Sequence, residues 1–492
     1  MSDSLQILAD AIAAGITTPD VQMLEAMKGL FGNRYHSRSA QNLKHERPPF
    51  VRNAYGKGGE TEHVAYAGFI NPENPPSGPY GGMSLVWFPS NEGSLIAFGI
   101  GTRGLSPDEG ILTRPGHRRR IASLRQHLVN LGAQMPWARQ DPATIGVPVP
   151  DLISKQFAAW EAVFKRYGNE LYCLTSVPKD NPEKARQIVQ AFLDLYAYER
   201  GWESLKDSKA ELENFIYGLN ATWLSTPDIS EIAHLLEQRR FVVLQGPPGT
   251  GKSRIAEQIL ENHYQGNGFV TQFHPSTTYE DFIAGLSPDI AKEELRFRAR
   301  AGHLLNAAAL TEKAPALLVV DEINRADLGR VLGEAIYLFE AETSGNERSV
   351  ELPHPVEGKK QFTLPTTLRV LATMNTADRS VARMDLAIRR RFAFVSMMPD
   401  RKVVQAHSTA LGLQLFDSLC DVFLEFASDD ALALLPGHSY FIVKDKDETV
   451  LRDRLRYELL PLVNDYIREG YLGPATASLH AVRDQIADAA NR

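Results

Sequence analysis

Cysteine is scarce in this chain, and long apolar runs are lacking. The 492 residues contain two cysteines, Cys173 and Cys420, which lie far apart and have no CxxC spacing. This pattern argues against a disulfide scaffold and a structural zinc site, and it favours reduced thiols buried in cores. The sequence contains no run of about 18 apolar residues, which is the length needed to span a bilayer. The first residues, MSDSLQILADAIAAG, have no basic segment before their apolar part, so we expect no secretory signal and a cytoplasmic location.

Positive charge is not in excess either. The formal net charge is -7 at pH 7, so any contact with nucleic acid must come from a local basic patch. Apolar residues at 43% and charged residues at 23% are typical of a globular protein. A chain of 492 residues is too long for one ordinary core, which favours two or three domains.

The sequence pattern predicts four segments. Residues 1–200 mix helical spacing with a glycine- and proline-rich part that contains a strand pair at 83–101, which predicts an α+β N-terminal domain. Residues 201–228 predict a linker helix. In 229–398, apolar strands alternate with helices, the pattern of an α/β domain with a parallel sheet and helices on both faces. Residues 399–492 are mostly helical and predict a smaller helical lid.

The strongest chemical motif is GPPGTGKS, residues 246–253, which matches G-x-x-x-x-G-K-[ST] between a predicted strand and a predicted helix. Glycines allow backbone N–H groups to face phosphates, and the helix N-terminus adds positive potential. Lys252 would reach the β- and γ-phosphates, and the Ser253 hydroxyl would bind Mg²⁺. The strand and helix on either side disfavour the alternative, an incidental glycine-rich turn.

Two further apolar strands end in polar side chains. Asp321 and Glu322 follow the strand 316–320, where they would hold Mg²⁺ through water and polarise the attacking water. The segment LRVLATMNTADRS, residues 368–380, makes the same change from apolar to polar. If its strand lies between the other two, Asn375 is next to the γ-phosphate, where an amide orients water without adding charge. Taken alone, the acidic pair is also typical of a solvated strand end or a helix cap, and the cluster around Asn375 is also typical of a turn that ends a strand.

Three arginines, Arg389, Arg390 and Arg391, end a short predicted helix before the strand 392–397. A guanidinium offered across a subunit boundary could stabilise charge on a neighbour's transferring phosphoryl group. The alternative is a solvated basic helix end that interacts with its own dipole. We expect at least one of the three to act in trans, and the sequence leaves open which one.

Together these motifs resemble those of AAA+ ATPases, in particular the McrB-like branch of restriction NTPases. The resemblance covers about residues 229–492 and rests on GPPGTGKS, FHPSTTYEDFIAGL, VVDEINRADLG, MNTADRS, DLAIRRRF and GHSYF. MNTADRS is the most specific of these. The family implies a hexameric ring, hydrolysis of ATP or GTP with Mg²⁺ at subunit interfaces, stimulation by a McrC-like nuclease subunit, and movement on DNA.

The resemblance also implies roles for single residues. Asp321 and Glu322 would be the acidic pair, Asn375 the sensor, and one of the three arginines the finger. Thr376 and Asp378 would help to place water or receive activating residues of the partner. The residues expected to bind nucleotide are Gly246, Pro247, Pro248, Gly249, Thr250, Gly251, Lys252, Ser253 and Ile255. The residues expected to hold Mg²⁺ are Ser253 and Asp321. For His438, in GHSYF, nucleotide sensing and plain packing both stay open.

The N-terminal domain contains a basic segment, residues 113–127. Its arginines are Arg114, Arg118, Arg119, Arg120 and Arg125. With nearby Tyr80, Trp87 and Phe88 they could bind phosphates and stack bases of DNA. A plain basic helix start, or a surface that docks the ATPase ring, is the alternative. His117 is expected at the surface or as a cap, and the segment GGMSLVWFPS as sheet core. This domain does not resemble the methylcytosine-binding module known in the family, so modified-base recognition is not implied.

We expect a ring-forming AAA+ NTPase that powers a McrBC-like DNA restriction or anti-phage complex, with residues 1–200 choosing the target and a separate McrC-like subunit cutting. One rival is a MoxR- or dynein-like protein-remodelling ATPase without nucleic acid. Another is a nucleotide-gated switch that assembles on a phage protein. The sequence leaves open ATP against GTP, the target, hexamer against heptamer, and translocation against assembly alone.

Overall fold

The computed structural model describes residues 4–31, 50–53, 64–70, 81–141, 144–201, 209–288, 297–340, 348–377 and 384–491. It divides into two units, one of residues 1–223 with 424–426, and one of the remaining residues of 224–492. In the described ranges, no helix is long and apolar enough to cross a membrane. Cys173 and Cys420 are buried free thiols, as the sequence predicts.

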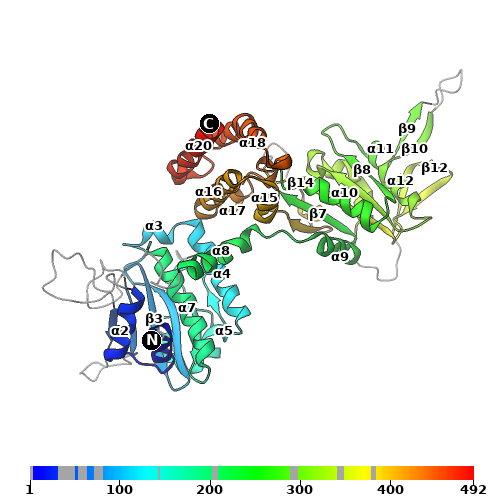
Figure 1. Ribbon diagram of the computed structural model, residues 1–492. Helices are drawn as coiled ribbons and strands as arrows, with labels where there is room; N and C mark the ends of the chain where they lie inside the picture. The colour runs from blue at the N-terminus through cyan, green and yellow to red at the C-terminus, as the bar shows by residue number, and fades with distance from the viewer. Residues whose placement is uncertain are drawn as a thin grey trace. The chain divides into compact units, whose positions relative to one another are not determined.

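The first unit combines helices with one six-stranded sheet (Figure 1). Its strands are β1 (Phe50–Asn53), β2 (Tyr66–Phe69), β3 (Met83–Ser90), β4 (Gly93–Ile100), β5 (Trp137–Ala138) and β6 (Leu171–Pro178). They pair antiparallel in the order β1-β2-β3-β4-β6-β5. Its helices are α1 (Ser4–Ala13), α2 (Val21–Phe31), α3 (Glu109–Leu112), α4 (Pro115–Asn130), α5 (Asp151–Ser154), η3 (Lys155–Trp160), α6 (Glu161–Tyr167), α7 (Pro182–Glu199), α8 (Lys209–Ala221) and η4 (Thr222–Leu224). An α+β fold is therefore confirmed for this part.

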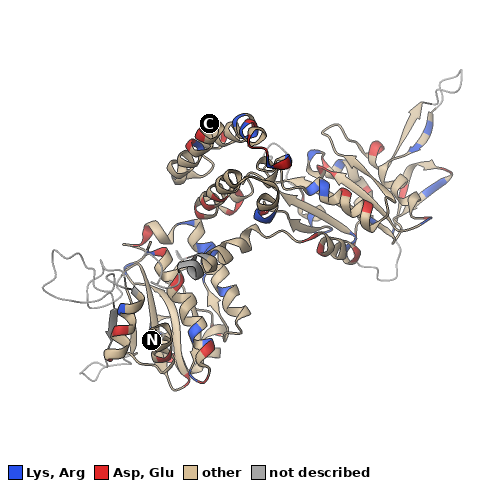
Figure 2. Cartoon of the chain, in the orientation of Figure 1, with Lys and Arg blue, Asp and Glu red and all other residues tan. Residues whose placement is uncertain are grey.

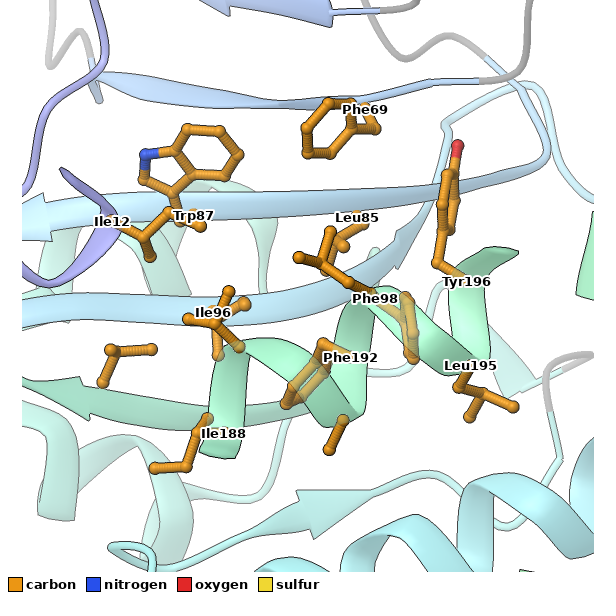
Figure 3. Close-up of a cluster of buried hydrophobic side chains, with 14 of the residues drawn as sticks. Ile12, Phe69, Leu85, Trp87, Ile96, Phe98, Ile188, Phe192, Leu195 and Tyr196 are labelled. Atoms are coloured by element: carbon orange, nitrogen blue, oxygen red, sulfur yellow. The ribbon is translucent and has the colours of Figure 1, made fainter. Parts of the chain in front are cut away.

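Both faces of this sheet are covered, which explains the apolar run in β3. Side chains alternate across a strand, so Leu85 and Trp87 enter one core and Val86 and Phe88 the other. Figure 3 shows the first core, where Phe192 and Ile188 of α7 lie among side chains of the sheet. The prediction that MSLVWFPS forms sheet core is confirmed.

The second unit holds a parallel sheet, two hairpins and a set of C-terminal helices. Its strands are β7 (Phe241–Gly246), β8 (Gly268–Gln272), β9 (Ala284–Pro288), β10 (Phe297–Ala301), β11 (Ala316–Asp321), β12 (Ser349–Val356), β13 (Lys359–Thr363), β14 (Leu368–Asn375) and β15 (Ala393–Ser396). Its helices up to residue 389 are α9 (Ile229–Arg239), α10 (Lys252–His263), α11 (Tyr279–Phe282), α12 (His303–Leu310), η5 (Ile323–Arg325), α13 (Leu328–Leu332), η6 (Gly333–Leu338) and α14 (Leu386–Arg389).

The parallel sheet has the order β15-β7-β14-β11-β8. Its strands are apolar on both sides because helices cover both faces. Val242 and Leu244 pack with α9 and α10 on one face, and Phe241 and Val243 pack with α12 and α13 on the other. This arrangement confirms the predicted α/β class and places the carboxyl ends of β7, β14 and β11 at one edge.

The residues after β15 are helical, as the sequence predicts for a lid. The helices are α15 (Arg401–His407), α16 (Ala410–Phe426), α17 (Asp429–Leu432), η7 (His438–Tyr440), η8 (Lys444–Lys446), α18 (Glu448–Arg454), η9 (Leu455–Leu459), α19 (Leu460–Arg468), η10 (Gly473–Ala475) and α20 (Thr476–Asn491). Two antiparallel hairpins, β9 with β10 and β12 with β13, form separate two-stranded sheets in the same unit. Neither hairpin was predicted from the sequence pattern.

Candidate active site

The segment GPPGTGKS forms the loop between β7 and α10. Gly249 and Gly251 both have φ of 79°, a conformation that side chains with a Cβ rarely adopt. Helix α10 starts directly after Gly251, so its first backbone N–H groups lack partners within the helix. Such unpaired N–H groups and the helix dipole favour an anion at this position.

Lys252 is buried within the loop, with 6% of its surface exposed. Its Nζ donates hydrogen bonds to the carbonyl oxygens of Gly246 at 3.0 Å and Pro247 at 2.7 Å. Burial lowers the pKa of Lys252 to about 8, although the nearby carboxylates of Glu322 and Asp321 oppose this change. The ammonium group is therefore positioned at the loop and only weakly neutralised by the protein.

Asp321 ends β11 and accepts two hydrogen bonds on one carboxylate oxygen. Ser253 Oγ donates to Asp321 Oδ1 at 2.7 Å, and Thr373 Oγ1 donates to the same atom at 2.5 Å. The next residue, Glu322, has left-handed backbone angles, φ 55° and ψ 48°, and its N–H donates to Thr373 Oγ1 at 3.1 Å. One threonine hydroxyl thus links both acidic residues to β14.

Asn375 lies at the end of β14, between β7 and β11. In the strand register it is opposite Gly246, and its Nδ2 donates to Glu322 Oε1. The position of β14 between the other two strands, on which the prediction for Asn375 depended, is therefore correct. Thr376 continues this contact, since its N–H donates to Gly246 O at 3.1 Å. Asp378 lies outside the described residues.

The three arginines of the predicted finger segment have different surroundings. Arg391 donates to Ala387 O and lies 3.7 Å from Glu340 Oε1, with 9% of its side chain exposed. Arg389 is exposed, and its guanidinium carbon is 4.6 Å from the ring centre of Phe394. Arg390 is exposed, and in the described ranges it makes no side-chain hydrogen bond or ion pair. Arg389 and Arg390 are the ones accessible to another molecule.

The lid segment GHSYF lies directly on the phosphate loop. The N–H of Gly437 donates to Pro248 O at 3.1 Å, and the N–H of Ser439 donates to Gly249 O at 3.0 Å. The approach leaves no room for a side chain, because a Cβ on Gly437 would lie 2.1 Å from the carbonyl carbon of Gly249. Two glycines therefore permit backbone contact between lid and loop.

Three residues of the site were missed in the sequence analysis. Thr373 is 2% exposed and joins the two acids, as described above. Asn324 donates from Nδ2 to Asn375 O at 3.2 Å, and Arg325 Nε lies 3.3 Å from Glu322 Oε2. For Thr373, the sequence signal was a hydroxyl within an apolar strand. For Asn324 and Arg325, it was their position shortly after the acidic pair Asp321 and Glu322.

The predicted stacking of bases on Trp87 and Phe88 is wrong. Trp87 and Phe88 are 0% and 3% exposed because both faces of β3 are covered, and Trp87 Nε1 donates to Ile16 O at 2.9 Å. Tyr80, the third predicted stacking residue, lies outside the described residues.

Two of the five predicted phosphate ligands are also buried. Arg119 and Arg120 are 3% and 1% exposed, and Arg120 donates to both carboxylate oxygens of Glu199 at 2.7 and 3.1 Å. His117 is fully buried, not at the surface as predicted, and its Nδ1 lies 3.1 Å from Glu199 Oε1. The side chains of His117 and Arg120 occupy one side of α4, where helical spacing places them with Ile121 and Leu124, whereas Arg119 lies on the same side as Ser123.

The other three basic residues of this segment keep access to solvent. Arg114 and Arg118 are partly exposed and Arg125 is exposed. Figure 2 shows Lys and Arg interspersed with Asp and Glu in both units. Of the five arginines predicted to bind phosphates, these three therefore stay candidates.

The fold and the site define an AAA+ nucleotide hydrolase. A glycine-rich phosphate loop, an acidic pair and an asparagine meet at one edge of a parallel sheet, next to a helical lid. Residues 241–392 match the family described as AAA domain (dynein-related subfamily).

Two curated proteins are similar to this chain. It is 30% identical over 348 residues to the type IV methyl-directed restriction enzyme EcoKMcrB subunit of Escherichia coli K12, covering 65% of this chain and 75% of that protein. It is 26% identical over 213 residues to the type II restriction enzyme BsuMI component YdiS of Bacillus subtilis 168, covering 34% of this chain and 61% of YdiS. The chain belongs to the McrB family of AAA+ proteins.

The match to the EcoKMcrB subunit is longer than the resemblance noted from motifs. Since 65% of 492 residues is more than residues 229–492 contain, the matched span includes part of the sequence before residue 229. Among solved structures, NtrX from Brucella abortus in complex with ATP is 12% identical with a TM-score of 0.25, covering 62% of this chain and 81% of that one. A likeness at this level supports no argument about the present site.

Proposed function

We propose that this chain is the nucleotide-hydrolysing motor subunit of a DNA restriction complex. The observation that supports the hydrolytic site best is a set of hydrogen bonds where three strands end. Ser253 and Thr373 both donate to Asp321, and Asn375 donates to Glu322. The restriction context is supported by similarity to two proteins named as parts of restriction enzymes. None of the described residues of the site distinguishes ATP from GTP, and we propose that the choice is made by contacts to the base.

In this proposal the phosphate loop binds the nucleotide before chemistry. Residues 246–253 offer backbone N–H groups at the start of α10, and Ile255 lies one turn along the same helix. Lys252 exchanges its loop carbonyls for the β- and γ-phosphates, where its charge is better neutralised. The stabilisation is electrostatic and acts without covalent participation of the protein.

The residues present fit a Mg²⁺ ion. A hydroxyl and a carboxylate, Ser253 and Asp321, already lie 2.7 Å apart, and oxygen ligands of this kind suit Mg²⁺ together with phosphates and water. When bound, the ion neutralises charge on the β- and γ-phosphates. Thr373 holds Asp321 in place by donating a hydrogen bond from Oγ1 to Asp321 Oδ1 at 2.5 Å.

We propose that Glu322 polarises the attacking water and that Asn375 orients it. Each carboxylate oxygen can accept more than one hydrogen bond, so the contacts of Glu322 with Asn375 and Arg325 leave acceptor capacity for water. The neutral amide of Asn375 adds no negative charge near the incoming nucleophile. Asp378 is proposed to support this arrangement from the same segment.

We further propose that the chain forms a ring, a hexamer by analogy with the family, with an arginine completing the neighbouring site. Arg389 and Arg390 are exposed on the segment before β15, whereas Arg391 is held by its own subunit through Ala387 and Glu340. The finger is therefore assigned to Arg389 or Arg390. A guanidinium in this role stabilises charge on the transferring phosphoryl group.

We also propose that the N-terminal unit selects a DNA target and that a separate McrC-like nuclease subunit stimulates hydrolysis and cuts. The protein-remodelling rival shares the AAA domain match, but the similarity to restriction-enzyme components favours the DNA role. The domain limits 1–200, 201–228, 229–398 and 399–492, and the cytoplasmic location, stay predictions.

The Glu322→Gln variant tests the hydrolytic proposal. The amide keeps the shape but cannot act as a base, so ATP and GTP binding should stay within about threefold of wild type while turnover falls about 100-fold or more. Nucleotide binding is measured by titration calorimetry and turnover by phosphate release, with the exposed Glu312→Gln variant as the matched control. Turnover close to wild type in Glu322→Gln would contradict the assignment of the base.

A further inference from the structure

The lid histidine, His438, has a fixed orientation relative to the phosphate loop. The backbone on both sides of it is tied to the loop, through Gly437 N–H to Pro248 O at 3.1 Å and Ser439 N–H to Gly249 O at 3.0 Å. The imidazole therefore has little freedom to move away from the loop unless the lid itself moves.

A hydrogen bond determines the tautomer of the ring. Nδ1 accepts from the backbone N–H of Asp400 at 3.2 Å, so Nδ1 carries no proton and Nε2 carries the hydrogen of the neutral ring. Burial lowers the pKa of His438, with Asp400 opposing and Arg254 adding to this effect. Near neutral pH, Nε2 is thus a single uncharged donor.

This donor points toward the start of α10. Nε2 lies 3.6 Å from the position that a Cβ on Gly251 would take. Among the residues that the structure describes, none accepts a hydrogen bond from Nε2. Glycine-rich loops of this pattern bind the α- and β-phosphates through backbone N–H groups, while the lysine reaches the β- and γ-phosphates.

We propose that His438 donates a hydrogen bond from Nε2 to the α- or β-phosphate of the bound nucleotide. The inference rests on the proposed nucleotide-binding function of the loop. It separates two roles: Asn375 contacts Glu322 at the end of the site where the γ-phosphate reacts, and His438 binds the part of the nucleotide that remains after hydrolysis. The lid would then respond to the presence of nucleotide, whether tri- or diphosphate.

The test compares His438→Ala and His438→Gln in the full chain. Dissociation constants are measured for a non-hydrolysable triphosphate and for the diphosphate of the same base. A hydrogen bond to a charged group corresponds to about tenfold or more in affinity. His438→Ala should weaken both ligands by about the same factor, and His438→Gln, which can still donate an N–H, should recover part of the loss. His407→Ala, an exposed lid histidine, is the matched control and should bind as wild type.

The outcomes separate this inference from the broader function. If wild type binds nucleotide, and Lys252→Ala does not, the loop function holds. Unchanged affinity of His438→Ala for both ligands, or a loss for the triphosphate alone, would then overturn the role of His438. If neither variant folds, carbethoxylation of His438 in the wild-type chain, mapped by mass spectrometry, decides: equal protection by both ligands supports the contact, and no protection refutes it.

Discussion

Replacing Thr373 by valine removes the one hydroxyl that connects both acidic residues to β14. The side chain is 2% exposed, and valine has nearly the same shape, so packing is preserved while the two hydrogen bonds are lost. One is the bond to Asp321 Oδ1 at 2.5 Å, and the other comes from the Glu322 N–H at 3.1 Å. The perturbation therefore isolates polar contacts from volume.

The expected magnitude follows from these two contacts. A hydrogen bond to a charged acceptor contributes about 1.5–3 kcal/mol, and an unpaired buried N–H costs about 1–3 kcal/mol. Asp321 keeps its bond from Ser253 and is partly open to water, so we expect a total loss of about 2–4 kcal/mol. For a unit of this size, that corresponds to a decrease in Tm of roughly 4–16 °C.

Calorimetry of the full chain measures this change, with the relevant transition identified by its shift on adding nucleotide. Thr373→Ser keeps the hydroxyl and loses one methyl group, which costs about 1 kcal/mol. We also expect Thr373→Val, but not Thr373→Ser, to require more Mg²⁺ for half-maximal hydrolysis, because Asp321 is less well oriented. If valine melts like serine and requires no more Mg²⁺, the argument for Thr373 as the link is refuted.

Two further predictions concern charge. Because burial lowers the pKa of Lys252 to about 8 and phosphates favour its protonated form, nucleotide affinity should be constant below pH 8 and fall as the pH rises above it. Calorimetry at pH 9 in two buffers should show that binding takes up close to one proton per nucleotide. The Lys252→Arg variant should show no proton uptake. A nucleotide affinity that stays constant up to pH 9.5 would contradict the lowered pKa of Lys252. Binding of labelled DNA by the full chain should weaken between about 50 and 200 mM salt, with a smaller salt dependence in Arg125→Ala than in the control Lys402→Ala. Absence of binding at low salt would favour the protein-remodelling rival.

The core strands of the second unit were predictable from sequence because buried parallel strands are continuous apolar runs with sharp polar ends. The strand predicted at the start of the segment 368–380 extends to Asn375, and the one predicted at 316–320 ends at Asp321. The alternation of strands and helices was enough to place their ends at one edge.

Other features depend on contacts between residues far apart in the chain. The burial of Arg120 requires Glu199, 79 residues away, and sequence alone does not reveal such a partner. An arginine-rich segment at a helix start therefore suggested a surface patch where the structure has a buried ion pair. The β9–β10 hairpin was missed because its side chains are largely exposed, which leaves no strong alternation of apolar and polar residues.

The contact of the GHSYF segment with the phosphate loop is another long-range feature. The sequence GHSYF does not indicate that the backbone of Gly437 contacts the backbone of Gly249. Both glycines can be recognised in the sequence, but their role depends on the position of residues 437–441 relative to the phosphate loop in the folded chain. Predictions for this part could therefore name His438 without saying which of its nitrogen atoms faces the loop.

The hydrogen-bonded register of β14 limits how its sequence can vary. Asn375 is opposite Gly246 on one side, and Ala372 is opposite Val320 on the other, so a single strand aligns the phosphate loop with the acidic pair. Inserting or deleting one residue in 368–375 would move each later side chain of the strand to the opposite face of the sheet. The side chain of Asn375 would then point into the covered interior. Length changes in this family should therefore collect in the connections on either side of this strand, while the strand itself keeps a constant number of residues.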